Sequence, residues 1–197
     1  MADSLIAEAR REQIIRACID TLEEVGYNNL SLTKVARKAG ISTGLISYHF
    51  HDKLDLINHT LHFLVAKQLD FISGKVVLAH TPTGQLEAYI EAHLAYQETH
   101  SNDNIALIEI VFNARNEDDV AYYRMGEENE EDELKTMLLD ILKEGQQKDE
   151  FTQSFQPEIV ASIIAGAIEE RMLRVNSPIP TEQYADELIK MVKRLIV

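Results

Sequence analysis

The chain has 197 residues, a hydrophobic content of 45% and a formal net charge of −14 at pH 7. This length fits one or two domains of moderate size, and the acidic charge argues against unspecific binding of nucleic acid. The single cysteine excludes an internal disulfide and indicates the reducing cytoplasm. We expect no signal peptide, since no basic and then apolar segment opens the sequence, and no apolar run reaches membrane-spanning length.

Three helices are predicted before residue 53. The first covers 5–25, where apolar residues recur at helical spacing, and Gly26 follows as a cap. The second, 32–39, and the third, 43–50, are short, and each follows a serine that can act as an N-cap. Gly40 separates them, where a tight turn needs a backbone that only glycine adopts easily.

Two short helices joined by a tight turn, after a longer helix, predict a helix-turn-helix. Ala36 is small enough to let the two helices cross closely, and Ile41 and Ile46 are expected to fill the space between them. The alternative is an ordinary helical hairpin within a helical core. The combination of caps, glycine spacing and local charge favours the helix-turn-helix.

The outward side of this motif is predicted to face DNA. Residues 30–53 hold four basic side chains against one acidic, whereas residues 61–197 hold 12 against 25. Small and hydroxyl-bearing side chains at the start of 43–50 permit close approach to base edges, and the free N–H groups of helix starts favour phosphate. The residues concerned are Ser31, Thr33, Lys34, Arg37, Lys38, Ser42, Thr43, Gly44, Ser47, Tyr48 and Lys53.

The rest of the chain is also predicted to be helical. A long helix starts after Asp52, and GKVVLAHTPTG (74–84) is interpreted as a helix end and loop because no partner strand is apparent. Further helices are expected at about 83–100, 103–115, 119–147, 156–175 and 180–196.

Residues 10–57 resemble the TetR-type (tetracycline-repressor) family of bacterial transcription regulators. The similar positions are Gly26-Tyr27, Ser31-Leu32, Val35-Ala36, Ala39-Gly40-Ile41-Ser42, Gly44, Tyr48-His49-Phe50 and Lys53. Carried over by position, this resemblance implies that Thr33, Thr43, Gly44, Tyr48, His49 and Lys53 contact DNA. Ser47 departs from the pattern, since many members carry tyrosine there.

The resemblance implies an all-α fold of about nine helices in two domains. Residues 1–52 would form a three-helix DNA-binding domain, and residues 53–197 a larger domain that binds an effector and dimerises. The implied function is that of a homodimeric repressor, released from a palindromic operator in double-stranded DNA by a small lipophilic effector. Whether the effector releases or promotes DNA binding stays open from the sequence.

Polar or soft residues on apolar faces are candidates for the effector pocket: Tyr89, His93, Tyr96, Glu109, Phe112 and Met137. A buried carboxylate needs a partner, and for Glu109 this is a cationic ligand, Arg115, His93 or a helix end. By resemblance, the last two helices form the dimer interface, through Val160, Ile164, Ala167, Ile168, Leu188, Val192 and Leu195. The alternative is that these residues pack inside one chain.

Two other function classes are alternatives to a transcription regulator. A metal-dependent helical enzyme is disfavoured because Glu-x-x-His, His-Glu-x-x-His and paired cysteine ligands are absent from the sequence. Gly-x-Ser-x-Gly and phosphate-binding glycine loops are absent too, so we expect no catalytic residues, no metal and no cofactor. A helical adaptor that binds only protein is the remaining alternative, and a DNA-binding assay distinguishes it.

Overall fold

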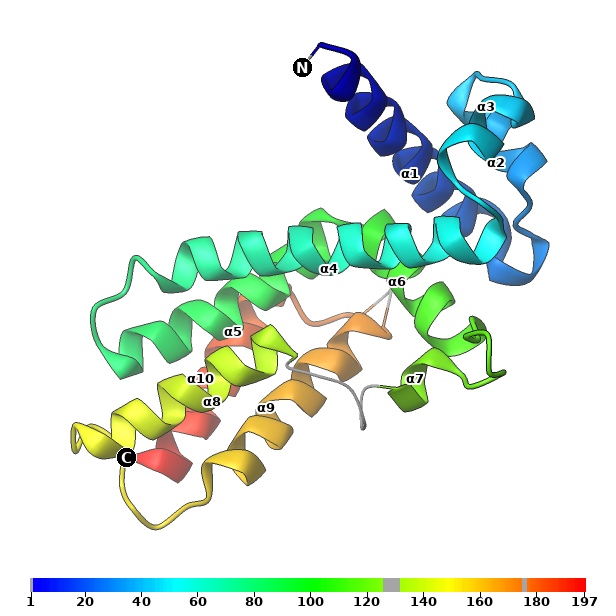
Figure 1. Cartoon of the computed structure of the whole chain (residues 1–197). Helices are drawn as coiled ribbons and strands as arrows, with labels where there is room; N and C mark the ends of the chain where they lie inside the picture. Colours follow the sequence, from blue (N-terminus) through cyan, green and yellow to red (C-terminus); the bar gives the residue numbers. More distant parts are fainter. Residues whose placement is uncertain (1, 126–131, 175–176) are drawn as a thin grey trace. The chain divides into compact units, whose positions relative to one another are not determined.

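The computed structural model describes residues 2–125, 132–174 and 177–197. Within these residues it contains ten α-helices, and its only extended pairing is an isolated bridge between Arg115 and Ala121 (Figure 1). The all-α class is therefore confirmed, with one helix more than the nine expected. The helices are α1 (Ala2–Asn29), α2 (Leu32–Ala39), α3 (Thr43–His49), α4 (Lys53–Val76), α5 (Pro82–Thr99), α6 (Ser101–Asn113), α7 (Tyr122–Met125), α8 (Glu133–Gln147), α9 (Pro157–Met172) and α10 (Thr181–Ile196).

The additional helix arises between 115 and 125, where the sequence pattern predicted one helix over 119–147. That prediction was wrong. The Asn116 side chain accepts the backbone N–H groups of Asp118 at 3.0 Å and Val120 at 2.8 Å, which closes a turn instead of a helix. The short α7 follows this turn. The later helix α8 starts separately, with Asp132 as its N-cap.

The segment GKVVLAHTPTG forms a helix end and loop, as predicted. The helix α4 ends at Val76, and the side chain of Thr81 accepts the backbone N–H of Gly84 at 3.1 Å to cap α5. Pro82 occupies the first turn of α5, where its missing N–H costs nothing.

The described chain forms two compact units. The first comprises α1 to α3, α4 as far as Ala66, α6 and α7; the second comprises α4 from Lys67 onward, α5, α8, α9 and α10. The predicted boundary after residue 52 falls at the start of α4, and it stays a prediction.

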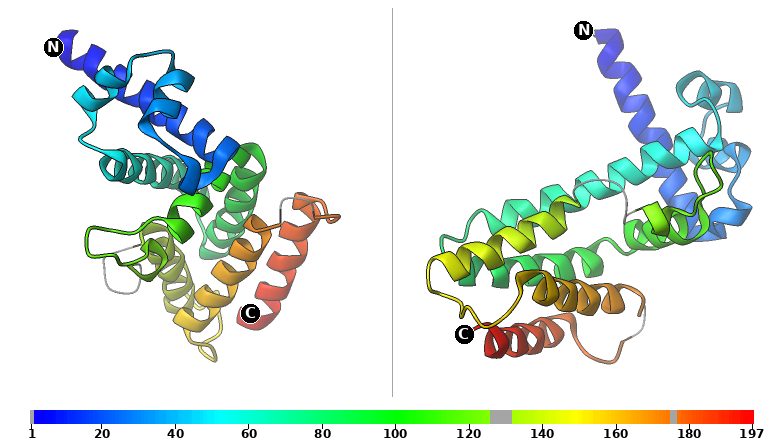
Figure 2. Two further views of the ribbon diagram at one scale, coloured as in Figure 1. Left: turned by 90° about the vertical axis from the view of Figure 1, so that its right-hand side faces the viewer. Right: turned by 60° about the horizontal axis from the view of Figure 1, so that its bottom comes forward.

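The first unit has its own hydrophobic core. In α1, the apolar residues that recur at helical spacing pack into this core, and Ile14, Cys18 and Leu22 are 0% exposed. Val35 of α2 and Ile46 of α3 join this core, with α2 packed against α1 and α3 packed against α2 (Figures 1 and 2). From α6, Ala106 and Ile110 complete this core.

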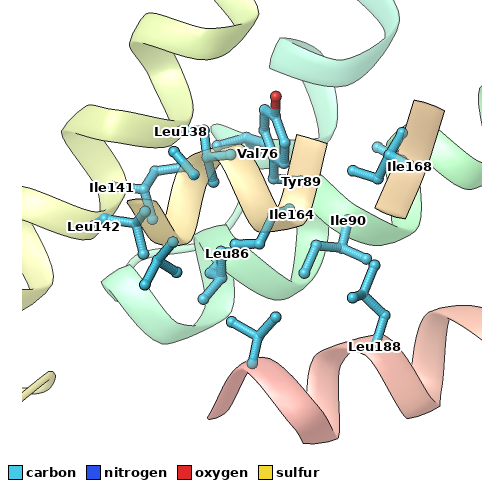
Figure 3. Packing of buried hydrophobic residues seen from close by; sticks show 14 of the residues in the cluster. Val76, Leu86, Tyr89, Ile90, Leu138, Ile141, Leu142, Ile164, Ile168 and Leu188 are labelled. Carbon is cyan, nitrogen blue, oxygen red and sulfur yellow. The ribbon is translucent and has the colours of Figure 1, made fainter. Parts of the chain in front are cut away.

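The second unit packs around the central helix α5. Leu86, Tyr89 and Ile90 of α5 contribute to one cluster with apolar side chains from α4, α8, α9 and α10 (Figure 3). The helices α9 and α10 lie side by side in this unit (Figure 2). Each therefore has an inner face that is already occupied by its own chain.

Candidate nucleic-acid interface

Local capping builds the helix-turn-helix as the sequence predicted. Ser31 caps α2 by accepting the N–H of Lys34, and Ser42 caps α3 by accepting the N–H of Leu45. Gly40 has φ 67° and ψ 32°, the left-handed conformation that ends a helix, and Ile41 N–H then returns to the carbonyl of Ala36 at 3.0 Å. Both helix boundaries agree with the expected ones to within one residue.

The predicted DNA contacts lie on the outside of this motif. Thr43, Gly44, Ser47 and Tyr48 are exposed on α3, and the Tyr48 side chain is 80% exposed with His49 at its edge. Ser31, Thr33 and Ser42 are exposed at the helix starts, while Lys34, His49 and Lys53 are half-buried. These hydroxyl-bearing and small residues are thus solvent-exposed, on α3 and at the starts of both short helices.

Gly44 has no role in packing. A Cβ atom built on it would meet only the Ser42 hydroxyl, at an ordinary contact distance of 3.9 Å. Glycine lowers helix stability by roughly 0.5–1 kcal/mol relative to alanine, so folding does not explain its presence in a seven-residue helix. The missing side chain leaves the backbone of α3 accessible to solvent at this position.

Two of the basic side chains of α2 have intramolecular partners. The Lys34 ammonium donates to the carbonyl of Asn29 at 2.8 Å, and the Lys38 ammonium pairs with the carboxylate of Glu24. The pair is exposed to solvent, where such ion pairs are weak and exchange readily. Arg37 is exposed at the end of the same helix. The Glu24 carboxylate therefore offsets part of the positive charge of this helix.

Lys53 has a structural role that the sequence did not reveal. Its ammonium donates to the carbonyl of Tyr27 at 2.8 Å and lies 4.2 Å from the centre of the Tyr27 ring. Burial lowers the pKa of Lys53 below its ordinary value. The side chain thus ties the start of α4 to the end of α1, and a phosphate contact by Lys53 stays a prediction.

The partner of Glu109 is a backbone group of the DNA-binding motif. Its carboxylate accepts the N–H of Tyr27 at 2.8 Å and lies 3.3 Å from the side-chain nitrogen of Asn113. That N–H is free because α1 is interrupted at Gly26, whose φ is 73° and ψ 167°. A Cβ on Gly26 would be 3.2 Å from the carboxylate oxygen. Of the partners that the sequence left open, which were a cationic ligand, Arg115, His93 and a helix end, Glu109 meets a helix end, since Tyr27 opens the helical segment after the break at Gly26.

The other predicted effector residues are divided between the two units. Tyr89, His93 and Tyr96 are buried on α5, where the Tyr89 hydroxyl donates to the carbonyl of Leu134 at 3.1 Å. Burial lowers the pKa of His93 to about 4. Phe112, by contrast, belongs to the first unit with Glu109, is 54% exposed, and stacks on Tyr123.

Met137 lines a groove of about 460 Å³ in the second unit. Its apolar floor comes from Val76, Met137 and Ile141, and three carboxylates stand around it. The lining residues are Val76, Gln85, Glu133, Thr136, Met137, Asp140, Ile141 and Glu144. This volume is in the range of small-molecule sites, and the surrounding carboxylates disfavour anionic ligands.

Most of the predicted dimer residues are inside the chain's own core. The buried ones are Val160, Ile164, Ile168, Leu188 and Val192, while Ala167 is half-buried and Leu195 is exposed. For the five buried residues, packing within one chain was the correct alternative. The apolar side chains on the outer faces are Ile159 and Ile163 of α9 and Met191 and Leu195 of α10. Their spacing of four residues on α9, repeated by Met191 and Leu195 on α10, is the signal that identifies this second stripe.

No described helix is both long and apolar enough to cross a membrane. Among the residues with described positions, no group of three or more His, Cys, Asp or Glu side chains is arranged to hold a metal ion.

Comparison with known proteins agrees with this geometry. Residues 14–60 match the family model of bacterial regulatory proteins of the tetR family. The chain is 30% identical over 94 residues to the HTH-type transcriptional regulator BetI of Pectobacterium carotovorum, a match that covers 47% of this chain and 48% of BetI. It thus spans about half the length of the curated relatives it matches.

Solved structures extend the similarity of fold over the whole chain. One is the regulator FadR of Bacillus subtilis in complex with stearoyl-CoA, with 20% identity, 92% and 96% of the two chains covered and a TM-score of 0.76. Another is AibR in complex with isovaleryl coenzyme A and operator DNA, with 14% identity, 92% and 97% covered and a TM-score of 0.76. The chain thus carries, over residues 14–60, the region that the family model of bacterial regulatory proteins of the tetR family describes, and its all-helical fold is similar to that of these solved structures.

Proposed function

We propose that the chain is a homodimeric, sequence-specific DNA-binding repressor that a small-molecule effector releases from a palindromic operator. One observation carries this proposal: α3 exposes Thr43, Gly44, Ser47 and Tyr48 together, on a motif whose inner residues are buried against α1. The exposed hydroxyls and small side chains suit the base edges of a major groove. The acidic remainder of the chain limits binding to other DNA.

Within this proposal, the dimer forms through the outer faces of α9 and α10. Ile159, Ile163, Met191 and Leu195 each expose half or more of their surface. Apolar area of this kind on two adjacent helices favours a two-fold interface with the same faces of a second copy. Dimerisation would present two α3 helices to half-sites separated by one turn of DNA, about 34–36 Å.

The effector in this proposal is lipophilic and carries no anionic group. The groove beside Met137 offers an apolar floor, but Glu133, Asp140 and Glu144 surround it. These carboxylates repel the phosphates of coenzyme A, the ligand named for two regulators of the same fold. Thermal unfolding with decyltrimethylammonium and with decanoyl-CoA tests this: only the cation should raise the midpoint, and stabilisation by decanoyl-CoA would contradict it.

We also place the protein in the cytoplasm and assign it no catalytic activity. Its relatives are transcription regulators, which act where DNA is found. Burial raises the pKa of the Cys18 thiol to about 11, so this thiol is unreactive and needs no special redox environment.

The decisive experiment is selection of a binding sequence from a random duplex library by the purified protein. We expect a palindromic site, bound by a dimer, with at least about 10³-fold preference over random DNA at moderate salt. Thr43→Ala should change which bases are preferred, because this residue faces the duplex. Recovery of no enriched sequence would reject the proposal and leave the protein-binding adaptor as the alternative.

A further inference from the structure

We infer that Arg11 is a positioning residue for operator recognition: from α1, it holds the carboxyl end of α3 in place without itself contacting DNA. This inference rests on the proposed function, since it assigns a role in sequence-specific DNA binding. It concerns a residue outside the helix-turn-helix and outside the set predicted to contact DNA.

The guanidinium of Arg11 makes three contacts around the end of α3. Its Nη1 donates to the carbonyl oxygen of His49, the last residue of α3, at 3.0 Å. Its carbon Cζ lies 4.8 Å from the centre of the Phe50 ring, which is buried. Its Nη2 is 2.9 Å from Nε2 of His59, which accepts in the tautomer that carries its proton on Nδ1. Both terminal nitrogens and one face of the group are therefore engaged by protein.

The His49 carbonyl needs such a partner. The last four carbonyl groups of a helix receive no hydrogen bond from an N–H group of the same helix. A cation at that end also interacts favourably with the helix dipole. The helix α3 has only seven residues, so its ends determine much of its position. Ser42 fixes the amino end, and Arg11 performs the corresponding function at the carboxyl end.

A second donor from α1 repeats the arrangement at α2. Two residues after Arg11, the Gln13 side chain donates to the carbonyl of Ala39, the last residue of α2, at 2.8 Å. The long helix α1 thus supplies one hydrogen bond to the carboxyl end of each helix of the motif. This repetition indicates that α1 sets the position of both helices, rather than only burying their apolar sides.

The contact also continues to the start of α4. Asp55, one turn before His59 on α4, accepts the N–H of His51 at 2.8 Å. The segment that follows α3 is therefore held from both sides, by Arg11 at His49 and by Asp55 at His51. A change at Arg11 loosens the first of these two attachments.

The neighbouring Arg10 provides a matched control. It has the same charge and lies on the same helix, but its guanidinium donates at 2.6 Å to Gln13, the residue that caps α2, so Arg10 acts on the end of α3 only through its charge. Any effect of charge alone should be shared by Arg10 and Arg11. Only an effect of positioning should be specific to Arg11.

The test uses the operator selected by the wild-type protein. Dissociation constants for this operator and for a random duplex are measured over a salt series with wild type, Arg11→Met, Arg11→Lys and Arg10→Met. We expect Arg11→Met to weaken operator binding about 10- to 100-fold, the usual effect of losing a hydrogen bond to a charged group. The affinity of Arg11→Met for the random duplex, and the salt slope of that binding, should equal those of Arg10→Met.

Arg11→Lys separates charge from geometry. Lysine keeps the charge but lacks the planar group that contacts His49, Phe50 and His59 together, so operator binding should stay weakened. Full operator binding by Arg11→Lys would overturn the inference. A salt slope reduced by about 0.9 in Arg11→Met but not in Arg10→Met would also overturn it, because such a reduction indicates that Arg11 contacts a phosphate. If Arg11→Met does not fold, Arg11→Lys decides by the same criteria.

A spectroscopic measurement adds a readout that global destabilisation does not reproduce. Burial, and then the charges of Arg11 and Arg10, lower the pKa of His49. An NMR titration should show a higher pKa for His49 in Arg11→Met than in Arg10→Met, and equal values would count against the contact. Failure of the wild-type protein to select any operator would instead reject the proposed function, so the two failures are distinguishable.

Discussion

The DNA-binding motif and the carboxy-terminal helices differ in how directly their sequences express their structure. In α2 and α3, each boundary follows from a serine cap or a glycine turn that is local in sequence. In α9 and α10, apolar residues occupy two faces, and local pattern does not distinguish the face that packs inside the chain from the face left exposed. The comparison shows that caps and turns are encoded by neighbours, whereas the choice of a buried face depends on distant helices.

Adjacent residues of α9 give the sharpest test of this comparison. Ile164 is 0% exposed in the core of the second unit, so Ile164→Ala should lower the free energy of unfolding by about 2–5 kcal/mol. Ile163 is 50% exposed, so Ile163→Asp should leave the helical circular dichroism intact while converting dimer to monomer. Urea unfolding and sedimentation measure the two effects. If Ile163→Asp lost as much stability as Ile164→Ala and remained a dimer, the result would contradict the proposed dimer face.

Buried His93 predicts a pH-dependent stability in the second unit. Its pKa is about 4 in the folded chain against an ordinary 6.5, so the unfolded chain takes up the proton first as the pH falls. Above pH 6.5 His93 has no effect, and between about pH 6.5 and 4 it should remove roughly 3 kcal/mol of stability. Urea unfolding over this range, compared with His93→Phe, isolates the contribution. An unchanged pH dependence in that variant would show that other groups cause it.

Glu109 tests how much the hydrogen bond from α6 to the break in α1 stabilises the first unit. Glu109→Ala leaves the N–H of Tyr27 without its acceptor and should cost about 1–3 kcal/mol. Glu109→Gln keeps an acceptor oxygen and should cost less. Thermal unfolding ranks the variants. If both retained wild-type stability, the hydrogen bond to Tyr27 would contribute nothing to folding.

Two glycines of the first unit should respond oppositely to alanine. Gly26 has φ 73° and borders the Glu109 carboxylate, so Gly26→Ala should destabilise the fold by about 1–2 kcal/mol. Gly44 is helical with open space around it, so Gly44→Ala should leave stability unchanged or raise it by up to about 1 kcal/mol, yet weaken DNA binding. Calorimetry and operator titration measure the two properties separately. Tight operator binding by Gly44→Ala would argue against close approach at this residue.

The helix class, the helix-turn-helix and its exposed face were predictable from the sequence because Ser31, Gly40 and Ser42 act on their immediate neighbours. The attachment of Glu109 and Lys53 to Tyr27 was not, since it joins residues 82 and 26 positions apart through a backbone group that has no sequence signature. The role of Arg11 was not predictable for the same reason, because its partner is the backbone carbonyl of His49, which any residue would supply equally.

The outer surface of α3 contributes little to folding, because the residues that anchor this helix point the other way or lie at its ends. Substitutions at Thr43, Gly44 or Ser47 therefore leave the core undisturbed. Mutations at these positions can change the DNA sequence that is recognised while the stability of the protein stays nearly the same. Regulatory specificity can therefore diverge while the fold is conserved.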